Sequence, residues 1–241
     1  MSFYIFKYVL VGFCCESSIK GLSTTHHLRR EKSPIFLMMM LTAFNVFAII
    51  NQILIMFMWT NTESGYGCVY GTWFENLAWN LYFVIADAYI LIKANTVAKN
   101  NKVYSVFAVG SFLYRIGWTI PDLVWVRGVW NADEKLCEYF SSPLSGLNCA
   151  VADILCDIVA SFLVLAVFLQ KKRLDPEATG VTLWQLLLKE NMIRSILALV
   201  VNSFILWANL HVDDINILFI FYGLQNYTYI QLMNLELYWK R

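Results

Sequence analysis

The stretch PIFLMMMLTAFNVFAIINQILIMFMW, residues 34–59, decides the fold class of this chain. It carries no charged side chain, and it exceeds the roughly 20 apolar residues that a helix needs to cross the hydrocarbon of a bilayer. The proline at its first position fits a helix start, because the N–H that proline lacks would have no helical partner there. The stretch therefore predicts a membrane-spanning helix.

The composition of the whole chain agrees with a lipid solvent. Hydrophobic residues make up 59% and charged residues 15% of the sequence, and the mean hydropathy is +0.56. A soluble domain carries roughly a quarter charged residues. The net charge of +1 creates no field that would favour nucleic acid, so the lipid bilayer is an expected partner and nucleic acid is not.

Further apolar stretches predict an all-α polytopic membrane protein, a single seven-helix transmembrane domain over residues 1–241. Spans with short loops use up the whole length, so no room remains for a soluble domain. In the fourth span, Pro121 should kink or end the helix near its outer end. The expected spans cover residues 3–18, 34–59, 73–93, 103–126, 147–170, 183–210 and 215–238.

The first apolar stretch, Phe3 to Cys15, is short for a span and contains Lys7. One interpretation is a cleaved signal peptide, and the other is a short first span, either complete or clipped. No A-x-A-like cleavage site follows, which favours the short span.

The orientation follows from the positive charges in the connecting segments, because Lys and Arg are retained on the cytoplasmic side. The connecting segments on one side of the membrane, which include residues 127–146, contain only two basic residues, Arg127 and Lys135. The segments on the other side contain twelve. The amino end is therefore expected outside and the carboxyl end in the cytoplasm, in the plasma membrane or an endomembrane. The twelve are Lys20, Arg29, Arg30, Lys32, Lys93, Lys99, Lys102, Lys171, Lys172, Arg173, Lys240 and Arg241.

Three of the six cysteines fall on or near the outer face, where disulfides form if the compartment is oxidising. Cys68 precedes the third span and Cys137 lies in the longest outer loop, so a bridge between them would fasten that loop over the outer mouth. Cys149 is an alternative partner, and three free thiols remain the other alternative, since connectivity does not follow from sequence.

Polar residues inside spans are costly, so they face the bundle interior and mark candidate sites. Asn76, Asn80 and Asp87 share one stripe of the third span with Phe83, since they lie four and seven positions apart. Arg115, near the bilayer centre, is expected to pair with Asp157.

Asp122, with no obvious partner, is left to water or a ligand. The expected ligand site is an outer polar pocket for a small polar or cationic molecule. The alternative is that the same residues are purely structural and form interhelical hydrogen bonds and one ion pair. The pocket residues are Asn76, Asn80, Arg115, Trp118, Asp122, Asp153 and Asp157. Nearer the cytoplasm, Asp87 and Arg194 lie at similar depth and are expected to pair, linking two helices.

Seven spans, an outside amino end, Cys68 and a basic third inner loop together resemble a G-protein-coupled receptor. The resemblance implies ligand sensing outside and a cytoplasmic G protein or other signalling partner. The motifs depart from it: Asp87-Ala88-Tyr89 stands in place of Asp-Arg-Tyr, and Asn226-Tyr227-Thr228-Tyr229 lacks the proline of Asn-Pro-x-x-Tyr. The entry to the sixth span, from Thr182-Leu183-Trp184 through Asn191, resembles seven-span membrane proteins common in fungi.

Other classes fit the residues less well. The last span, 215–238, has no lysine for retinal, and the three histidines lie outside the spans, so neither a metal nor another cofactor is expected. No catalytic residues stand out, and the chain is not expected to be an enzyme. The alternative function is a transporter or channel for a small solute or ion that uses the acidic intramembrane site.

Overall fold

The computed structural model describes residues 2–28, 35–60, 65–98, 102–131, 136–174, 192–212 and 215–239. These residues form seven helices and one antiparallel hairpin, so the predicted all-helical class is confirmed and the hairpin is an addition to it. The helices are α1 (Ser2–Leu28), α2 (Ile35–Thr60), α3 (Gly65–Val97), α4 (Lys102–Trp125), α5 (Pro143–Leu174), α7 (Met192–His211) and α8 (Ile215–Trp239). The strands β1 (Arg127–Asn131) and β2 (Leu136–Phe140) lie between α4 and α5.

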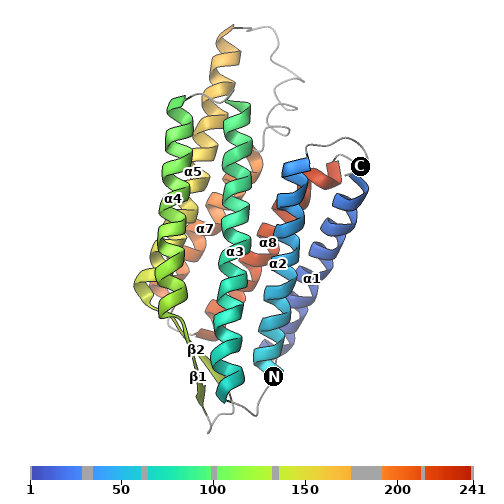
Figure 1. The fold of residues 1–241 in the computed structure, drawn as a ribbon, viewed down its shortest axis with the longest axis vertical. Coiled ribbons are helices and arrows are strands. Elements are labelled where there is room, and N and C mark those ends of the chain that lie inside the picture. Colours follow the sequence, from blue (N-terminus) through green and yellow to red (C-terminus); the bar gives the residue numbers. More distant parts are fainter. Residues whose placement is uncertain are drawn as a thin grey trace.

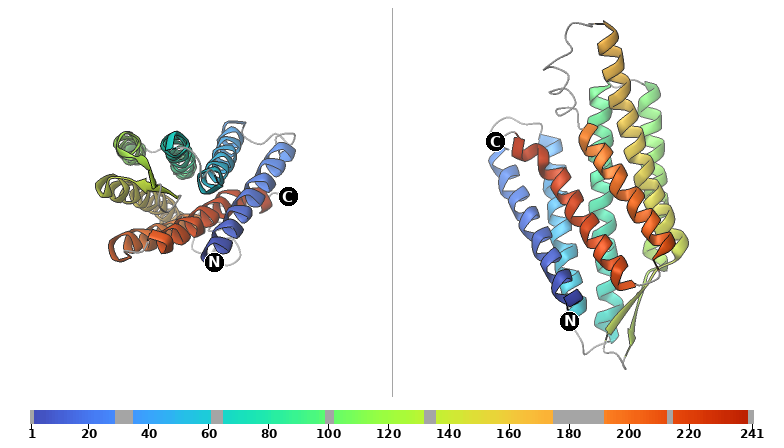
Figure 2. Two further views of the ribbon diagram at one scale, coloured as in Figure 1. Left: turned by 90° about the horizontal axis from the view of Figure 1, so that it is seen from below. Right: turned by 180° about the vertical axis from the view of Figure 1, so that it is seen from behind.

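The helices form an elongated bundle in which successive helices run in opposite directions (Figure 1). The hairpin and the start of α1 lie at the same end, which we call the hairpin end, and α8 finishes at the other end (Figure 1). Neighbours along the chain pack together, and α1 closes the ring by packing on α8 (Figure 2). The helix α3 contacts α2, α4, α5 and both strands, so it carries the centre of the bundle.

The surface of the bundle is apolar and much of its interior is polar, which is the reverse of a soluble protein. On α4, Val106 and Phe107 are 71% and 61% exposed, whereas Arg115 of the same helix and Asn80 of α3 are fully buried. Four of the described helices are long and apolar enough to cross a membrane: residues 35–58, 65–96, 102–125 and 144–163. The chain therefore has the build of a membrane protein.

Three helices, α1, α3 and α5, are longer than the sequence predicted, and α5 extends the expected span 147–170 by four residues at each end. The helix α1 continues to Leu28, through residues that were expected to form an inner loop. Two of its polar side chains are hydrogen-bonded there: Ser17 Oγ accepts a hydrogen bond of 2.6 Å from Gln231 of α8, and Thr25 donates to the carbonyl of Gly21 in α1 itself. The helix α3 begins at Gly65, eight residues early, so Cys68 lies within it.

Other boundaries agree more closely with expectation. The helix α4 runs four residues past Pro121 and ends at Trp125, close to the predicted end at 126. The helix α5 starts with Pro143, a residue suited to a first helical position. The predicted beginning of the sixth span, residues 183–191, and the inner loop at 175–182 lie outside the described residues.

Candidate functional site

A cavity of about 440 Å³ opens at the hairpin end, among all seven described helices and beneath the hairpin. This volume falls within the range of small-molecule sites, roughly 300 to 1,000 Å³. The wall combines apolar and aromatic side chains, such as Trp79 of α3 and Tyr222 of α8, with polar groups such as Glu75 of α3. A cavity of this kind suits an organic molecule with an apolar body and a polar group.

The hairpin is fastened over this cavity by a disulfide. Cys68 of α3 and Cys137 of β2 are bonded, with an S–S distance of 2.07 Å, while Cys149 is a buried free thiol. The predicted bridge is thus confirmed, and the alternative partner Cys149 is not used. The close approach of β1 to α3 depends on Gly128, because a Cβ there would overlap the carbonyl oxygen of Cys68.

Tyr139 of β2 connects the hairpin to the helical wall. Its hydroxyl donates a hydrogen bond of 3.2 Å to Oδ1 of Asn76, and the residue lines the cavity. Withdrawal from water raises the pKa of Tyr139 well above its usual value, and the nearby carboxylates of Glu75 and Asp122 raise it further. The phenol therefore remains a neutral donor at physiological pH.

Glu75 places a carboxylate in the wall of the cavity. Its Oε1 accepts a hydrogen bond of 2.8 Å from Nδ2 of Asn51 on α2, and the same Nδ2 lies 3.2 Å from the carbonyl oxygen of Glu75. Among the residues that the structure describes, Oε2 of Glu75 receives no hydrogen bond. One oxygen of this acid is therefore available to a ligand.

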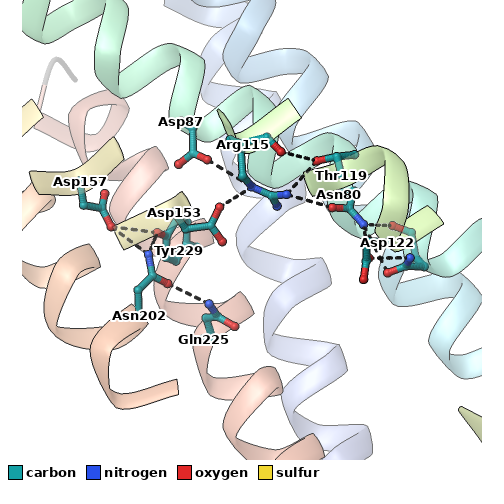
Figure 3. A network of polar contacts seen from close by, with 11 residues as sticks. Asn80, Asp87, Arg115, Thr119, Asp122, Asp153, Asp157, Asn202, Gln225 and Tyr229 are labelled. Atoms are coloured by element: carbon teal, nitrogen blue, oxygen red, sulfur yellow. Dashed lines mark hydrogen bonds and ion pairs between the residues drawn. The ribbon is translucent and has the colours of Figure 1, made fainter. Parts of the chain in front are cut away.

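Asp122 on α4 is held by neutral donors from two other helices. Its Oδ2 accepts from Nδ2 of Asn80 at 3.0 Å (Figure 3) and from Nδ2 of Asn76 at 2.9 Å, and its Oδ1 accepts from Ser145 Oγ at 2.7 Å. Three donors stabilise the ionised carboxylate in place of a cation. Asp122, which the sequence left without a partner, thus joins α3, α4 and α5.

Arg115 lies at the centre of the polar network (Figure 3). Its Nη1 donates to Asn80 Oδ1 at 3.1 Å and to Thr119 Oγ1 at 2.8 Å. Its Nε is in ion-pair contact with Asp153, and it lies 3.6 Å from Oδ2 of Asp87. The guanidinium carbon also lies 5.9 Å from the ring centroid of Trp79, within cation–π range.

Two predicted pairings are wrong. Arg115 pairs with Asp153 rather than Asp157, because Asp157 is turned to α7 and α8, where its Oδ2 accepts from Asn202 at 2.8 Å and from Tyr229 at 3.3 Å. Asp87 pairs with Arg115 rather than Arg194. The guanidinium carbon of Arg194 instead lies 5.5 Å from the ring centroid of Tyr89.

The predicted ligand residues divide into two groups. Asn76, Asp122 and Asp153 line the cavity, whereas Asn80, Arg115 and Asp157 lie in the network behind it. Trp118 is half-buried on α4, where its ring packs edge-on against Tyr114, and it does not line the cavity. Part of the predicted ligand set therefore lines this cavity, and the rest lies outside its lining.

The cavity also contains residues that the prediction omitted. Gln225 and Asn226 of α8 both line it. They also reach the network, since Gln225 donates to Asn202 at 2.9 Å and Asn226 accepts from Tyr82. Their polarity within an apolar span was the signal available in the sequence. No such signal marks the aromatic lining, because aromatic residues are common in every span of this chain.

Comparisons with protein-family models and with curated proteins found no relative of this chain. The functional argument therefore starts from the geometry of the cavity and the charges around it.

Proposed function

We propose that this protein is a seven-span, receptor-like membrane protein that captures a small organic cation from outside the cell and signals to a cytoplasmic partner. The observation that carries the proposal is a hairpin-capped cavity in which the carboxylate of Glu75 has a free oxygen. The capture site, the direction of the signal and the number of spans are parts of one hypothesis.

The arrangement of the helices supports seven crossings. The three helices beyond the four most apolar ones, α1, α7 and α8, have 27, 20 and 25 residues. At a rise of about 1.5 Å per residue, 20 residues cover the roughly 30 Å of hydrocarbon. They also pack side by side with the other four in alternating direction. The excess of basic residues at the end opposite the hairpin favours a cytoplasmic location for that end.

The charges on the cavity wall favour a cationic ligand. Asp122 accepts from three donors and Asp153 is ion-paired with Arg115, whereas Glu75 has neither an ion pair nor a donor for its second oxygen among the described residues. The Lys7 ammonium lies 5.0 Å from the ring centroid of Phe219, so this cation is already engaged with the wall. Trp79, Phe219 and Tyr222 supply aromatic faces that suit an organic cation.

Binding of amines to the purified full chain in lipid nanodiscs tests the ligand class. The probes are ethylamine, phenethylamine and tryptamine, with indole-3-acetate as the anionic match for tryptamine. We expect saturable binding of the aromatic amines and none of the acetate. Glu75→Gln should weaken tryptamine binding about tenfold to a hundredfold, since a hydrogen bond to a charged group contributes about 1.5–3 kcal/mol.

Glu16→Gln is the matched control, because Glu16 is an exposed acid on α1 that pairs with Lys20 at 2.6 Å. It should leave tryptamine binding unchanged. Absence of saturable binding by every amine, or equal binding by wild type and Glu75→Gln, would contradict the cationic ligand class.

A second measurement separates signalling from transport. Amine-dependent guanine-nucleotide exchange on an added heterotrimeric G protein, without amine flux into proteoliposomes, would support the receptor. Flux of the bound amine across proteoliposomes, with no exchange, would refute the receptor and support the transporter.

A further inference from the structure

Three aspartates and one arginine are buried together next to the cavity, and one of them, Asp153, lines it (Figure 3). Asp87 of α3, Asp153 and Asp157 of α5 and Arg115 of α4 are each at most 1% exposed. Among the described residues, no second Lys or Arg nitrogen lies within 4.0 Å of these carboxylates. If all four groups were ionised, the cluster would carry two uncompensated negative charges, and uncompensated charge in such a medium is strongly unfavourable.

The three carboxylates differ in the donors that face them. Asp157 accepts from the neutral donors Asn202 and Tyr229, and Asp153 is in contact with Nε of Arg115. Asp87 is different, because neither of its oxygens receives a hydrogen bond from the described residues.

The Nε atom of Arg115 cannot donate a hydrogen bond to Asp87 and to Asp153 at the same time. Both carboxylates lie against Nε, which carries a single hydrogen. The Nη1 group is committed to Asn80 and Thr119, and Nη2 has no partner among the described residues. Because both carboxylates face the same Nε, Asp87 and Asp153 are neighbours. A donor is therefore missing between two adjacent acids.

We propose that Asp87 and Asp153 share one bound proton beside Arg115, which makes this cluster a proton-binding site of the folded protein. The proton resides on Asp87, and its O–H donates to the carboxylate of Asp153, which keeps its ion pair with Arg115. The bound proton comes from solvent on folding or on exchange, so the pair carries one negative charge and not two.

The other titratable side chains that face the pair do not replace this proton. They are Tyr82 of α3, Cys149 and Cys156 of α5, and Tyr229 of α8. Phenols and thiols are neutral near pH 7, and α7 contributes the uncharged amide of Asn202. None of these groups supplies a positive charge.

Infrared spectroscopy of the purified chain in nanodiscs tests the proposal without any ligand. A protonated carboxylic acid has a C=O stretching band above the amide I band, and this band shifts to lower frequency in D₂O. We expect the wild type to show such a band near neutral pH. Asp87→Asn, which places a neutral amide where the protonated acid stands, should remove it.

Asp153→Asn is the second variant, and it should also remove the band, because Asp87 then becomes the single ionised partner of Arg115. Asp122→Asn is the control and should leave the band in place, since Asp122 is a buried aspartate whose oxygens already accept hydrogen bonds from three donors. A folded wild type without the band, or a band that survives in both Asp87→Asn and Asp153→Asn, would overturn the proposal. These outcomes do not depend on whether the cavity binds amines.

Discussion

Asn45 of α2 and Asn234 of α8 hold one another by two hydrogen bonds, in which each Nδ2 lies 2.9 Å from Oδ1 of the other residue. Both side chains are fully buried. The pair connects helices that are separated by 189 positions in the chain. It gives the α1, α2 and α8 side of the bundle a specific register, which nonspecific apolar packing in lipid would not provide.

The Asn45–Asn234 pair should show energetic coupling. We expect Asn45→Ala and Asn234→Ala each to lower the free energy of unfolding by about 1–3 kcal/mol, because each leaves a buried amide without its partner. The coupling energy from the double mutant should be about 0.6–1.7 kcal/mol. Denaturation in mixed detergent measures both. Thr42→Ala, which removes a bond to the carbonyl of Met38 in its own helix, is the control, and zero coupling would contradict the pairing.

Gly21→Ala should be destabilising although alanine favours helices. A Cβ at Gly21 would lie 2.5 Å from Nδ2 and from Oδ1 of Asn234, a side chain that Asn45 holds in place. Overpacking typically costs about 1–3 kcal/mol, which exceeds the gain of about 1 kcal/mol from helix propensity. Thermal unfolding should show a lower midpoint. Gly110→Ala on α4, where nothing lies within 4 Å, should not lower it; equal effects at both sites would refute the contact.

Gly128→Ala should loosen the hairpin. The new Cβ would overlap the carbonyl oxygen of Cys68 and lie 2.5 Å from Thr72 Oγ1, and a helix carbonyl cannot move aside cheaply. We expect faster hydrogen exchange in β1 and β2 and faster reduction of the Cys68–Cys137 disulfide by a mild thiol. The matched variant is Gly65→Ala, whose Cβ would meet Trp130 at an ordinary 3.8 Å. Unchanged exchange in Gly128→Ala would show that the hairpin does not rest on α3 as described.

Ser145→Ala should destabilise the junction of α4 and α5. The hydroxyl of Ser145 donates to Oδ1 of Asp122 at 2.7 Å, and a hydrogen bond to a charged group contributes about 1.5–3 kcal/mol. Ser111→Ala removes a bond of 3.1 Å to the neutral carbonyl of Ala108 and should cost less. Unfolding of both variants under the same conditions makes the comparison, and a larger loss in Ser111→Ala would argue against an ionised Asp122.

The sequence by itself determined the helical class and the polar positions of the interior. Hydropathy is a local property, so a run such as residues 34–59 specifies a membrane helix before any tertiary contact forms. The spacing of Asn76, Asn80 and Asp87 likewise fixed their common face on α3, because helix geometry alone sets that relation. The placement of Cys68 and Cys137 at the same end of the bundle was accessible in the same way.

Only the tertiary structure decided which polar groups meet. Asp153 and Asp157 lie four residues apart on one face of α5, about 6 Å along the axis, so a small shift or rotation of the helix exchanges one for the other as the partner of Arg115. The local sequence does not specify this shift or rotation of α5. It is set by the packing of α5 against α3, α4 and α7, which is also why the pocket beneath the hairpin, with Glu75 in its wall, emerged only from the folded chain.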